Sequence, residues 1–394
     1  MSIPYNGPMY LILMIIMLSP LVIGLLRGKR YLIYQNIVTL VLLYLIFGGS
    51  HWHQGVAILC YVAWQWLLVY SYFKYRSKKN NSYVFYGAVL LAIAPLAVSK
   101  ITPLLAHETS IVGFLGISYL TFKAVQMVME MRDGLIKKFS SLNFLEFLLF
   151  FPTISSGPID RYRRFEKEHH LPPTKEKYVT MLDKGIFMIV LGCLYKFIIA
   201  YYINLYAIDY LHKTALINGF FSLNTWAYMY SYSLYLFFDF AGYSLFAVGT
   251  SYIMGYTVPI NFNKPFSSPN IKEFWNRWHM SLSFWFRDFV FMRLVFTMIK
   301  KKTFKSKILI SNISYMSLFL LMGLWHGLTW YYVAYGLFHG LAICVNDAWI
   351  RYKKKHKNLP SNWATYALAV FITFNTVCFS FLIFSGILDK MFFK

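Results

Sequence analysis

The stretch that decides the fold class is residues 363–388, which read WATYALAVFITFNTVCFSFLIFSGIL. It carries no charged side chain, and it exceeds the roughly 20 apolar residues that a helix needs to cross a bilayer. A helix on the surface of a water-soluble domain would instead show a charged or polar face along its length. The stretch therefore predicts a helix that spans a membrane.

Similar apolar runs recur along the whole chain. Of its residues, 58% are hydrophobic and only 13% are charged, whereas a water-soluble domain averages about a quarter charged. The other predicted spans are Met9–Leu26, Tyr31–Gly48, Gly55–Phe73, Tyr83–Val98, Ser110–Met129, Gly185–Leu211, Thr225–Met254, Leu309–Leu324 and Trp330–Val345. We therefore expect an all-α, polytopic membrane protein with about 10–11 transmembrane helices.

Two segments do not fit a simple crossing. Within 141–184, a short apolar run meets Pro152 and then Gly157-Pro158, which favours a short or re-entrant helix followed by a cytoplasmic loop. Within 257–307, cations interrupt an aromatic-rich stretch, a pattern typical of helices in the membrane interface or lining a protein cavity. We expect residues 1–394 to form one transmembrane domain that contains both segments.

The charge balance is strongly basic, with 38 Lys and Arg against 15 Asp and Glu. The basic residues fall in short clusters between apolar runs, as in cytoplasmic loops beside an anionic leaflet. This pattern favours a membrane over nucleic acid, and it would attract an acidic soluble partner. The first 26 residues carry no Lys or Arg, so the N-terminus is predicted to be extracellular. The clusters are Arg27–Arg30, Lys74–Lys79, Arg161–Arg164, Lys300–Lys302 and Arg351–Lys357.

The sequence offers no metal or disulfide set. All four cysteines lie inside apolar runs and form no close pair, which is typical of small buried hydrophobes. His51 and His53 are two possible ligands without a third.

Polar residues among the spans are the candidates for chemistry. His326 ends one apolar run just before the next, with Gly323 and Gly327 beside it and Trp325 as a flat apolar wall. An ionisable group within a membrane protein is costly and points to function, although a neutral imidazole bonded to a neighbouring helix is an even alternative for His339. A histidine can remove a proton from a hydroxyl near neutral pH, which suits general-base acyl transfer.

Four motifs now carry a family resemblance. They are residues 151–162 (FPTISSGPIDRY), 238–244 (FDFAGYS), 274–283 (FWNRWHMSLS) and 324–327 (LWHG). With them, the 47-residue spacing of His279 and His326 resembles the membrane-bound O-acyltransferase (MBOAT) family, and within it the proteins that pass D-alanine to teichoic acid in Gram-positive bacteria. The resemblance covers nearly the whole chain.

The resemblance implies a ring of helices around a central tunnel in the cell membrane. It implies that His326 is the catalytic base and His279 its helper, with 309–346 forming the helices around His326. The donor would be D-alanine, thioester-linked to the phosphopantetheine of a small acidic carrier protein in the cytoplasm. The acceptor would be a teichoic acid hydroxyl on the outer side, with other D-alanylation proteins as partners. The chain itself would bind no metal or cofactor.

Further residues fit this picture with competing interpretations. Asp239 could orient an imidazole or bind the D-alanyl ammonium, or simply pair with a Lys or Arg. Arg161 could contact the pantetheine phosphate, although a structural role beside Gly157-Pro158 is favoured. Asn276 and Ser283 flank His279 at i−3 and i+4, so one helical face could present all three.

A docking surface for the carrier protein is also predicted. Val295 and Phe296, followed by Lys300 and Lys301, could hold a carrier by apolar contact and charge, or could anchor the segment in the membrane.

Two other functions stay open from the sequence. One is O-acetylation of an exported polysaccharide by a protein of the same family. The other is a transporter or channel with an in-membrane histidine relay, which the absence of an inverted repeat disfavours.

Overall fold

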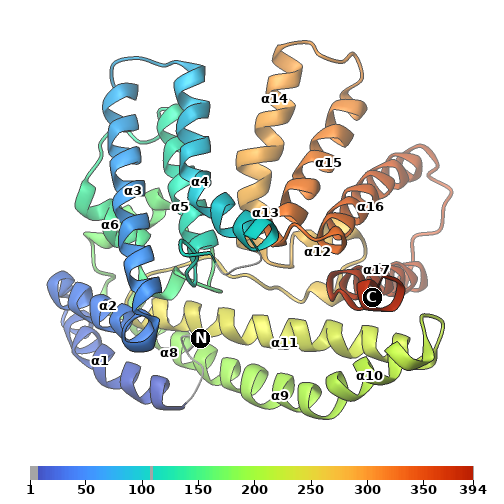
Figure 1. Ribbon diagram of the computed structural model, residues 1–394, viewed down its shortest axis with the longest axis horizontal. Coiled ribbons are helices and arrows are strands. Elements are labelled where there is room, and N and C mark those ends of the chain that lie inside the picture. The colour runs from blue at the N-terminus through green and yellow to red at the C-terminus, as the bar shows by residue number, and fades with distance from the viewer. Residues whose placement is uncertain (1–7, 107–109, 394) are drawn as a thin grey trace. The chain divides into compact units, whose positions relative to one another are not determined.

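A computed structural model describes residues 8–106 and 110–393, and within these ranges it contains helices and no strand (Figure 1). The all-α prediction is therefore confirmed. The described chain divides into two compact units. The N-terminal unit runs to Gly192 and includes Tyr243–Pro259, and the C-terminal unit comprises Cys193–Gly242 and the chain from Ile260 onward.

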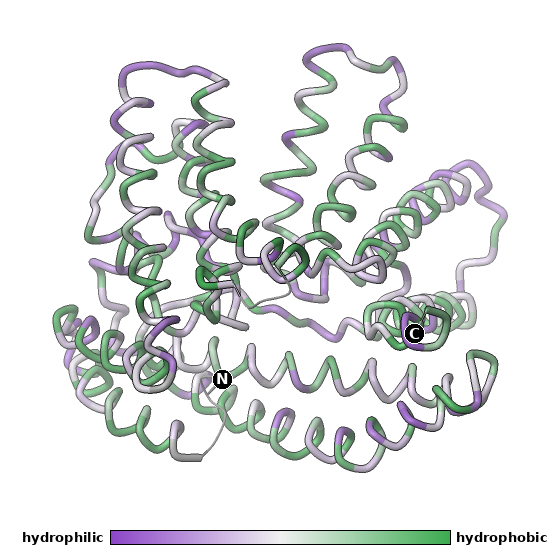
Figure 2. Tube along the Cα trace, in the orientation of Figure 1, coloured by the Kyte–Doolittle hydropathy of each residue, from purple (hydrophilic) through white to green (hydrophobic). Residues whose placement is uncertain are grey.

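The N-terminal unit contains eight α-helices among the described residues. Its helices α3 and α4 lie side by side as a hairpin whose connection is hydrophilic (Figures 1 and 2). The helices are α1 (Pro8–Leu26), α2 (Leu32–Phe47), α3 (Trp52–Arg76), α4 (Ser82–Ala106), α5 (Ile117–Arg132), α6 (Ser141–Leu148), α7 (Tyr162–His169) and α8 (Lys175–Cys193).

The C-terminal unit carries the predicted catalytic histidines, and its helix α11 (Leu223–Ile253) also contributes residues to the N-terminal unit. Its other helices are α9 (Tyr201–Ile203), α10 (Asp209–Asn218), α12 (Ile271–Trp275), α13 (Met280–Phe286), α14 (Met292–Lys300), α15 (Lys307–His326), α16 (Trp330–Lys355), α17 (Trp363–Phe384) and α18 (Ile387–Phe392). Turns of π-helix at Leu194–Ala200, Asn204–Ile208 and Arg287–Phe291 join neighbouring helices without a break.

Seven helical segments of the described chain are long and apolar enough to cross a membrane. They are Trp52–Arg76, Ser82–Ala106, Lys175–Asn218, Leu223–Ile253, Lys307–His326, Trp330–Lys355 and Trp363–Phe384. Two shorter apolar helices, Ile12–Leu26 and Leu32–Phe47, correspond to the first two predicted spans. The remaining predicted span begins only at Ile117, because Gly116 adopts a left-handed conformation that ends the preceding turn.

The short helix expected near Pro152 is present as α6, which ends at Leu148 before a buried 3-10 turn, Phe151–Thr153. The fully buried Lys123 donates hydrogen bonds to the carbonyl oxygens of Phe147 (3.0 Å) and Leu148 (3.2 Å). These oxygens are the last of α6 and have no partner within the helix. A buried lysine amine therefore caps the end of α6.

Helices α15 and α16 form a tight pair because glycines line their contact. A Cβ at Gly323 would collide with the Tyr332 carbonyl oxygen, and one at Gly336 would collide with that of Phe319. The space beside Gly323 is thus occupied by the backbone of α16. This close approach holds the end of α15, with His326, against the start of α16.

Candidate active site

His326 is the last residue of α15 and lies half-buried within aromatic rings. Its ring centroid is 4.6 Å from Trp325, 5.0 Å from Phe384 and 5.9 Å from Tyr335. These neighbours come from α15, α17 and α16, so three helices fix the imidazole from different sides. Trp325, the predicted wall residue, is a direct neighbour of the imidazole.

His279 begins α13 in a left-handed conformation (φ 42°) and is only 4% exposed. A residue with a Cβ adopts this conformation at a cost, which suggests that the surrounding contacts enforce it. The Met280 N–H donates to the Asn261 carbonyl (2.9 Å), and the Ser281 hydroxyl donates to the Asn261 side chain (2.6 Å). Asn261 therefore holds the start of α13 and directs the His279 ring, which packs 4.8 Å from Phe240.

The two histidines interact electrostatically. Burial, with a smaller contribution from the charge of His326, lowers the pKa of His279 to about 3. The His279 imidazole is consequently neutral at physiological pH, and its Nδ1 finds no hydrogen-bond partner among the described residues. A neutral imidazole with an unsatisfied nitrogen can orient or polarise a bound group.

His339 has a different environment. It is completely buried, its Nδ1 accepts a hydrogen bond from the Trp275 indole (3.2 Å), and its Nε2 lies 3.0 Å from the Ser380 hydroxyl. Ser380 donates its own hydrogen to the Val377 carbonyl (2.6 Å), so Nε2 must be the donor. Both nitrogens are satisfied in one neutral tautomer, which supports the structural interpretation of His339.

Asn276 and Ser283 do not share a helical face with His279, and that expectation is wrong. Helix α12 ends at Trp275, and α13 begins after the left-handed His279. The two side chains instead line a common cavity.

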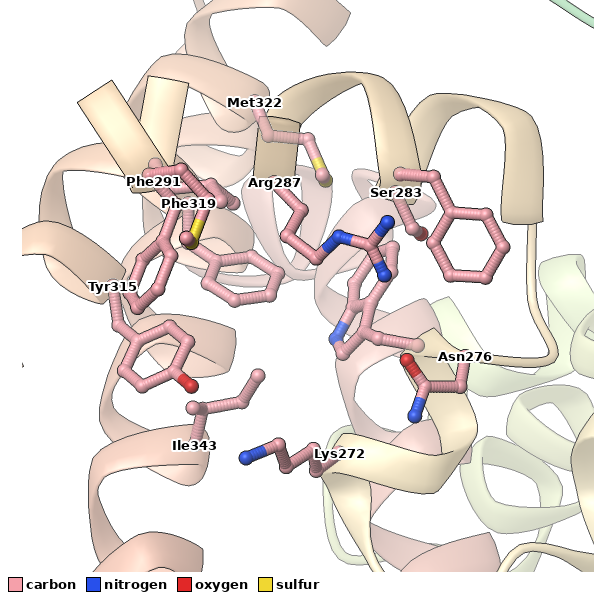
Figure 3. A pocket seen from close by; sticks show the side chains of 13 residues that line it. Lys272, Asn276, Ser283, Arg287, Phe291, Tyr315, Phe319, Met322 and Ile343 are labelled. Carbon is pink, nitrogen blue, oxygen red and sulfur yellow. The ribbon is translucent and has the colours of Figure 1, made fainter. Parts of the chain in front are cut away.

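This cavity has a volume of about 270 Å³. Figure 3 shows Asn276 and Ser283 on one side, Tyr315 and Phe291 on the other, and Arg287 between them. Its lining residues are Lys272, Trp275, Asn276, Ser283, Phe284, Arg287, Phe291, Met292, Tyr315, Leu318, Phe319, Met322 and Ile343. Most of the wall is therefore apolar, with two cations and the neutral polar groups of Asn276, Ser283 and Tyr315.

Two lining residues lie one helical turn from the predicted histidines. Met322 lines the cavity from α15, which carries His326 one turn further on, a rise of about 6 Å. Ser283 lines it from α13 and donates its N–H to the carbonyl of His279, one turn back. The cavity and the two imidazoles are therefore neighbours along the same helices, although neither histidine is among the lining residues.

The other predicted site residues have structural partners. Asp239 pairs with Lys196 at 2.5 Å in the C-terminal unit. Arg161 lies in the N-terminal unit, where its N–H donates to the buried Asp160 (2.6 Å), which Arg164 also binds. These contacts support the structural alternatives for Asp239 and Arg161.

The predicted docking residues lie on and just after α14. Phe296 is 62% exposed, Val295 is half-buried, and Lys300 and Lys301 are exposed at the end of the helix. An exposed aromatic ring beside cations could meet either lipid or an acidic partner.

Two residues of the cavity, Lys272 and Arg287, were not singled out from the sequence. Lys272 lies 3.8 Å from Asp347, and Arg287 donates to Asp288 (2.9 Å) while its guanidinium covers Phe284. The sequence shows cations that interrupt an aromatic run in this segment. That pattern indicates an unusual segment, but it does not indicate which of its cations line a cavity. Across residues 8–106 and 110–393, no three His, Cys, Asp or Glu side chains are grouped as metal ligands would be.

Comparison with known proteins identifies the family of this chain and several relatives. The model of the MBOAT, membrane-bound O-acyltransferase family, matches residues 106–388. A teichoic acid D-alanyltransferase of Bacillus subtilis is 53% identical over 97% of this chain and 98% of its own length. One of Lacticaseibacillus rhamnosus is 52% identical over 99% of this chain and 98% of its own. A more distant relative, a peptidoglycan O-acetyltransferase of Helicobacter pylori, is 32% identical over 61% of this chain and 43% of its own.

Proposed function

The chain belongs to the membrane-bound O-acyltransferase family and is an acyltransferase, and from this premise we propose that it passes D-alanine from a carrier-protein thioester toward teichoic acid hydroxyls. The names of two relatives that are more than half identical over nearly the full chain support the acyl group and the acceptor. Family membership also weighs against the transporter alternative.

The observation that carries the proposal is the cavity whose lining includes Ser283 and Met322, which lie one helical turn along the chain from His279 and His326 respectively. The thioester lies at its inner end. His326 takes the proton of the acceptor hydroxyl, whose oxygen attacks the thioester carbonyl. The carbon–sulfur bond then breaks, and His326 returns the proton to the departing thiolate, which leaves an ester and a free thiol. His279 stays neutral and orients the reacting groups.

The donor arm fits the remainder of the cavity. A phosphopantetheine arm is long, mostly uncharged and ends in a phosphate, and the cavity offers apolar walls with Lys272 and Arg287 among them. These cations would bind the phosphate, with Asn276 and Ser283 available for the amides of the arm. The exposed Phe296, with Lys300 and Lys301, would meet the acidic carrier protein.

The same proposal includes the orientation of the protein in the membrane. The protein lies in the cell membrane of a Gram-positive bacterium, with the basic connections and the carrier protein in the cytoplasm. Teichoic acid and the other D-alanylation proteins lie on the outer side. The extracellular N-terminus that this requires falls on residues 1–7, outside the described residues.

The test uses the full-length protein in vesicles that contain lipoteichoic acid, with a D-alanyl-loaded carrier protein as donor. His326→Ala should lower the rate of D-alanyl ester formation by about 10²- to 10⁴-fold, the range for a lost general base. The matched control is His356→Ala, an exposed histidine just past the end of α16, which should keep the wild-type rate. Wild-type rates in the His326 variant would contradict the proposal.

A second candidate is O-acetyl transfer, because a distant relative is a peptidoglycan O-acetyltransferase. The same vesicles distinguish the two, since an acetyl donor and a D-alanyl carrier can be offered in turn. Turnover of the acetyl donor alone would favour the second candidate.

A further inference from the structure

Tyr335 lies beside the proposed base and has no assigned role. Its side chain is 2% exposed, and its ring contacts His326 at 5.9 Å, Phe384 at 5.1 Å and His339 at 4.7 Å. It sits on α16, directly before Gly336, where the backbone approaches α15 most closely. The packing that fixes His326 therefore also fixes Tyr335.

The hydroxyl of Tyr335 differs from those of the other deeply buried tyrosines. Tyr61 pairs with Thr121 (2.9 Å), Tyr162 with Glu166 (2.9 Å), Tyr178 with the Ile253 carbonyl (2.7 Å) and Tyr256 with His169 (2.9 Å). These four and Tyr335 are the described tyrosines that are at most 2% exposed. Only Tyr335 makes no hydrogen bond to any described residue.

The Tyr335 hydroxyl is not among the fully buried side-chain atoms that lack a partner, so it keeps a small accessible surface beside His326. A hydroxyl in so buried a residue normally pairs with a protein group, whereas this one is left open to a bound group. A phenylalanine would fill the same space and keep the same ring contacts. The useful property of the hydroxyl is that it can donate a hydrogen bond to a group that arrives only during the reaction. Such a donor is worth most in a dry site, where it is already oriented before charge develops.

We propose that the Tyr335 hydroxyl is a catalytic residue that donates a hydrogen bond to the carbonyl oxygen of the donor thioester as it becomes an oxyanion. This inference rests on the proposed function, because it places the thioester beside His326.

The step balances without a further reactant. The acceptor oxygen bonds to the carbonyl carbon, its proton moves to His326, and the carbonyl electron pair moves to oxygen. Tyr335 keeps its proton and shares it with that oxyanion. When the carbon–sulfur bond breaks, the carbonyl reforms and the proton on His326 passes to the thiolate.

The test is Tyr335→Phe in the full-length protein, assayed in the lipoteichoic acid vesicles with the D-alanyl-loaded carrier protein. We expect kcat to fall about 10²- to 10³-fold, as for loss of one oxyanion donor, with KM for the carrier little changed. The melting temperature should stay the same, because the hydroxyl that is lost pairs with no described protein group.

The matched control is Tyr178→Phe, which removes a buried hydroxyl that already has a partner, the Ile253 carbonyl. It should lower the melting temperature and leave kcat unchanged. An unchanged kcat in Tyr335→Phe, or a fall that merely follows a lower melting temperature, would overturn the inference. If Tyr335→Phe is fully active while His326→Ala is inactive, only this inference fails; if both are active, the proposed function fails.

Discussion

Two buried polar regions of this protein are organised in opposite ways. In the N-terminal unit, His169 lies 2.6 Å from Glu146 and 2.9 Å from the Tyr256 hydroxyl, which also accepts a hydrogen bond from Gln35 (3.1 Å). Asn36 donates to the other oxygen of Glu146 (2.6 Å). Each of these five side chains has a polar neighbour within the unit, so we call them the paired cluster.

In the C-terminal unit, some buried polar groups around the proposed reaction centre lack a hydrogen-bond partner. The Nδ1 of His279 and the Nδ2 of Asn261 are buried and have no partner among the described residues. Buried polar groups are normally paired, and the paired cluster shows that this sequence can achieve it. The two regions therefore differ: the paired cluster is held by its own polar neighbours, whereas the free nitrogens of His279 and Asn261 are available to a bound group.

The largest effect on stability is expected in the paired cluster. His169→Ala would leave Glu146 and Tyr256 buried without their shared partner, at a cost of roughly 3–5 kcal/mol in the free energy of unfolding. The rate per folded molecule should stay at wild type. Thermal unfolding in detergent and the vesicle assay measure the two quantities separately.

The neighbouring His170 supplies the control, because it is exposed and makes no hydrogen bond within the paired cluster; it lies 3.0 Å from the Asn143 amide, and its ring meets that of His169 edge-on at 5.0 Å. His170→Ala should change stability much less than His169→Ala. A folded His169 variant with a lost rate would break the comparison, since it would give the paired cluster a catalytic role.

The membrane fold could be predicted from the sequence because long uninterrupted apolar runs are rarely compatible with any structure other than membrane-spanning helices. It also indicated His326, since an imidazole among apolar residues is conspicuous. It could not place Asn276 and Ser283, because the left-handed turn at His279 depends on Asn261, distant in sequence and held by tertiary contacts. Tyr335 could not be identified from the sequence for another reason. The chain has 32 tyrosines, and the sequence does not indicate which of their hydroxyls lacks a hydrogen-bond partner.

An intermediate effect is expected from the pH dependence of stability at His279. Its pKa is about 3 in the folded protein, whereas an unfolded histidine titrates near about 6.5. The unfolded chain therefore binds a proton that the folded chain refuses as pH falls from about 6.5 to 3. This group stabilises the fold fully above about pH 6.5, and the stability is lost below it by up to about 1.4 kcal/mol per pH unit.

His279→Gln removes that proton uptake. The melting temperature of this variant should therefore fall less steeply than that of the wild type as the pH is lowered from about 6 to 4. The contrast is Tyr178→Phe, which should leave the slope of melting temperature against pH unchanged because a tyrosine hydroxyl does not titrate in this pH range. If the melting temperature depended on pH equally in the wild type and in His279→Gln, His279 would not be a buried neutral imidazole.

The smallest effect is expected on KM for the carrier protein, from the two cations that line the cavity. Lys272 and Arg287 are about half exposed, so each should contribute only about 1 kcal/mol to binding of the donor phosphate, roughly fivefold in KM. Lys272→Ala and Arg287→Ala should raise KM for the carrier and leave kcat unchanged, and Lys354→Ala, an exposed cation near the end of α16, should change neither. Because the Debye length falls from about 8 Å at physiological salt to about 3 Å at 1 M, both effects should shrink as salt is added. A lower kcat with unchanged KM would place these cations at the reacting atoms, and the cavity would then not be the path of the donor arm.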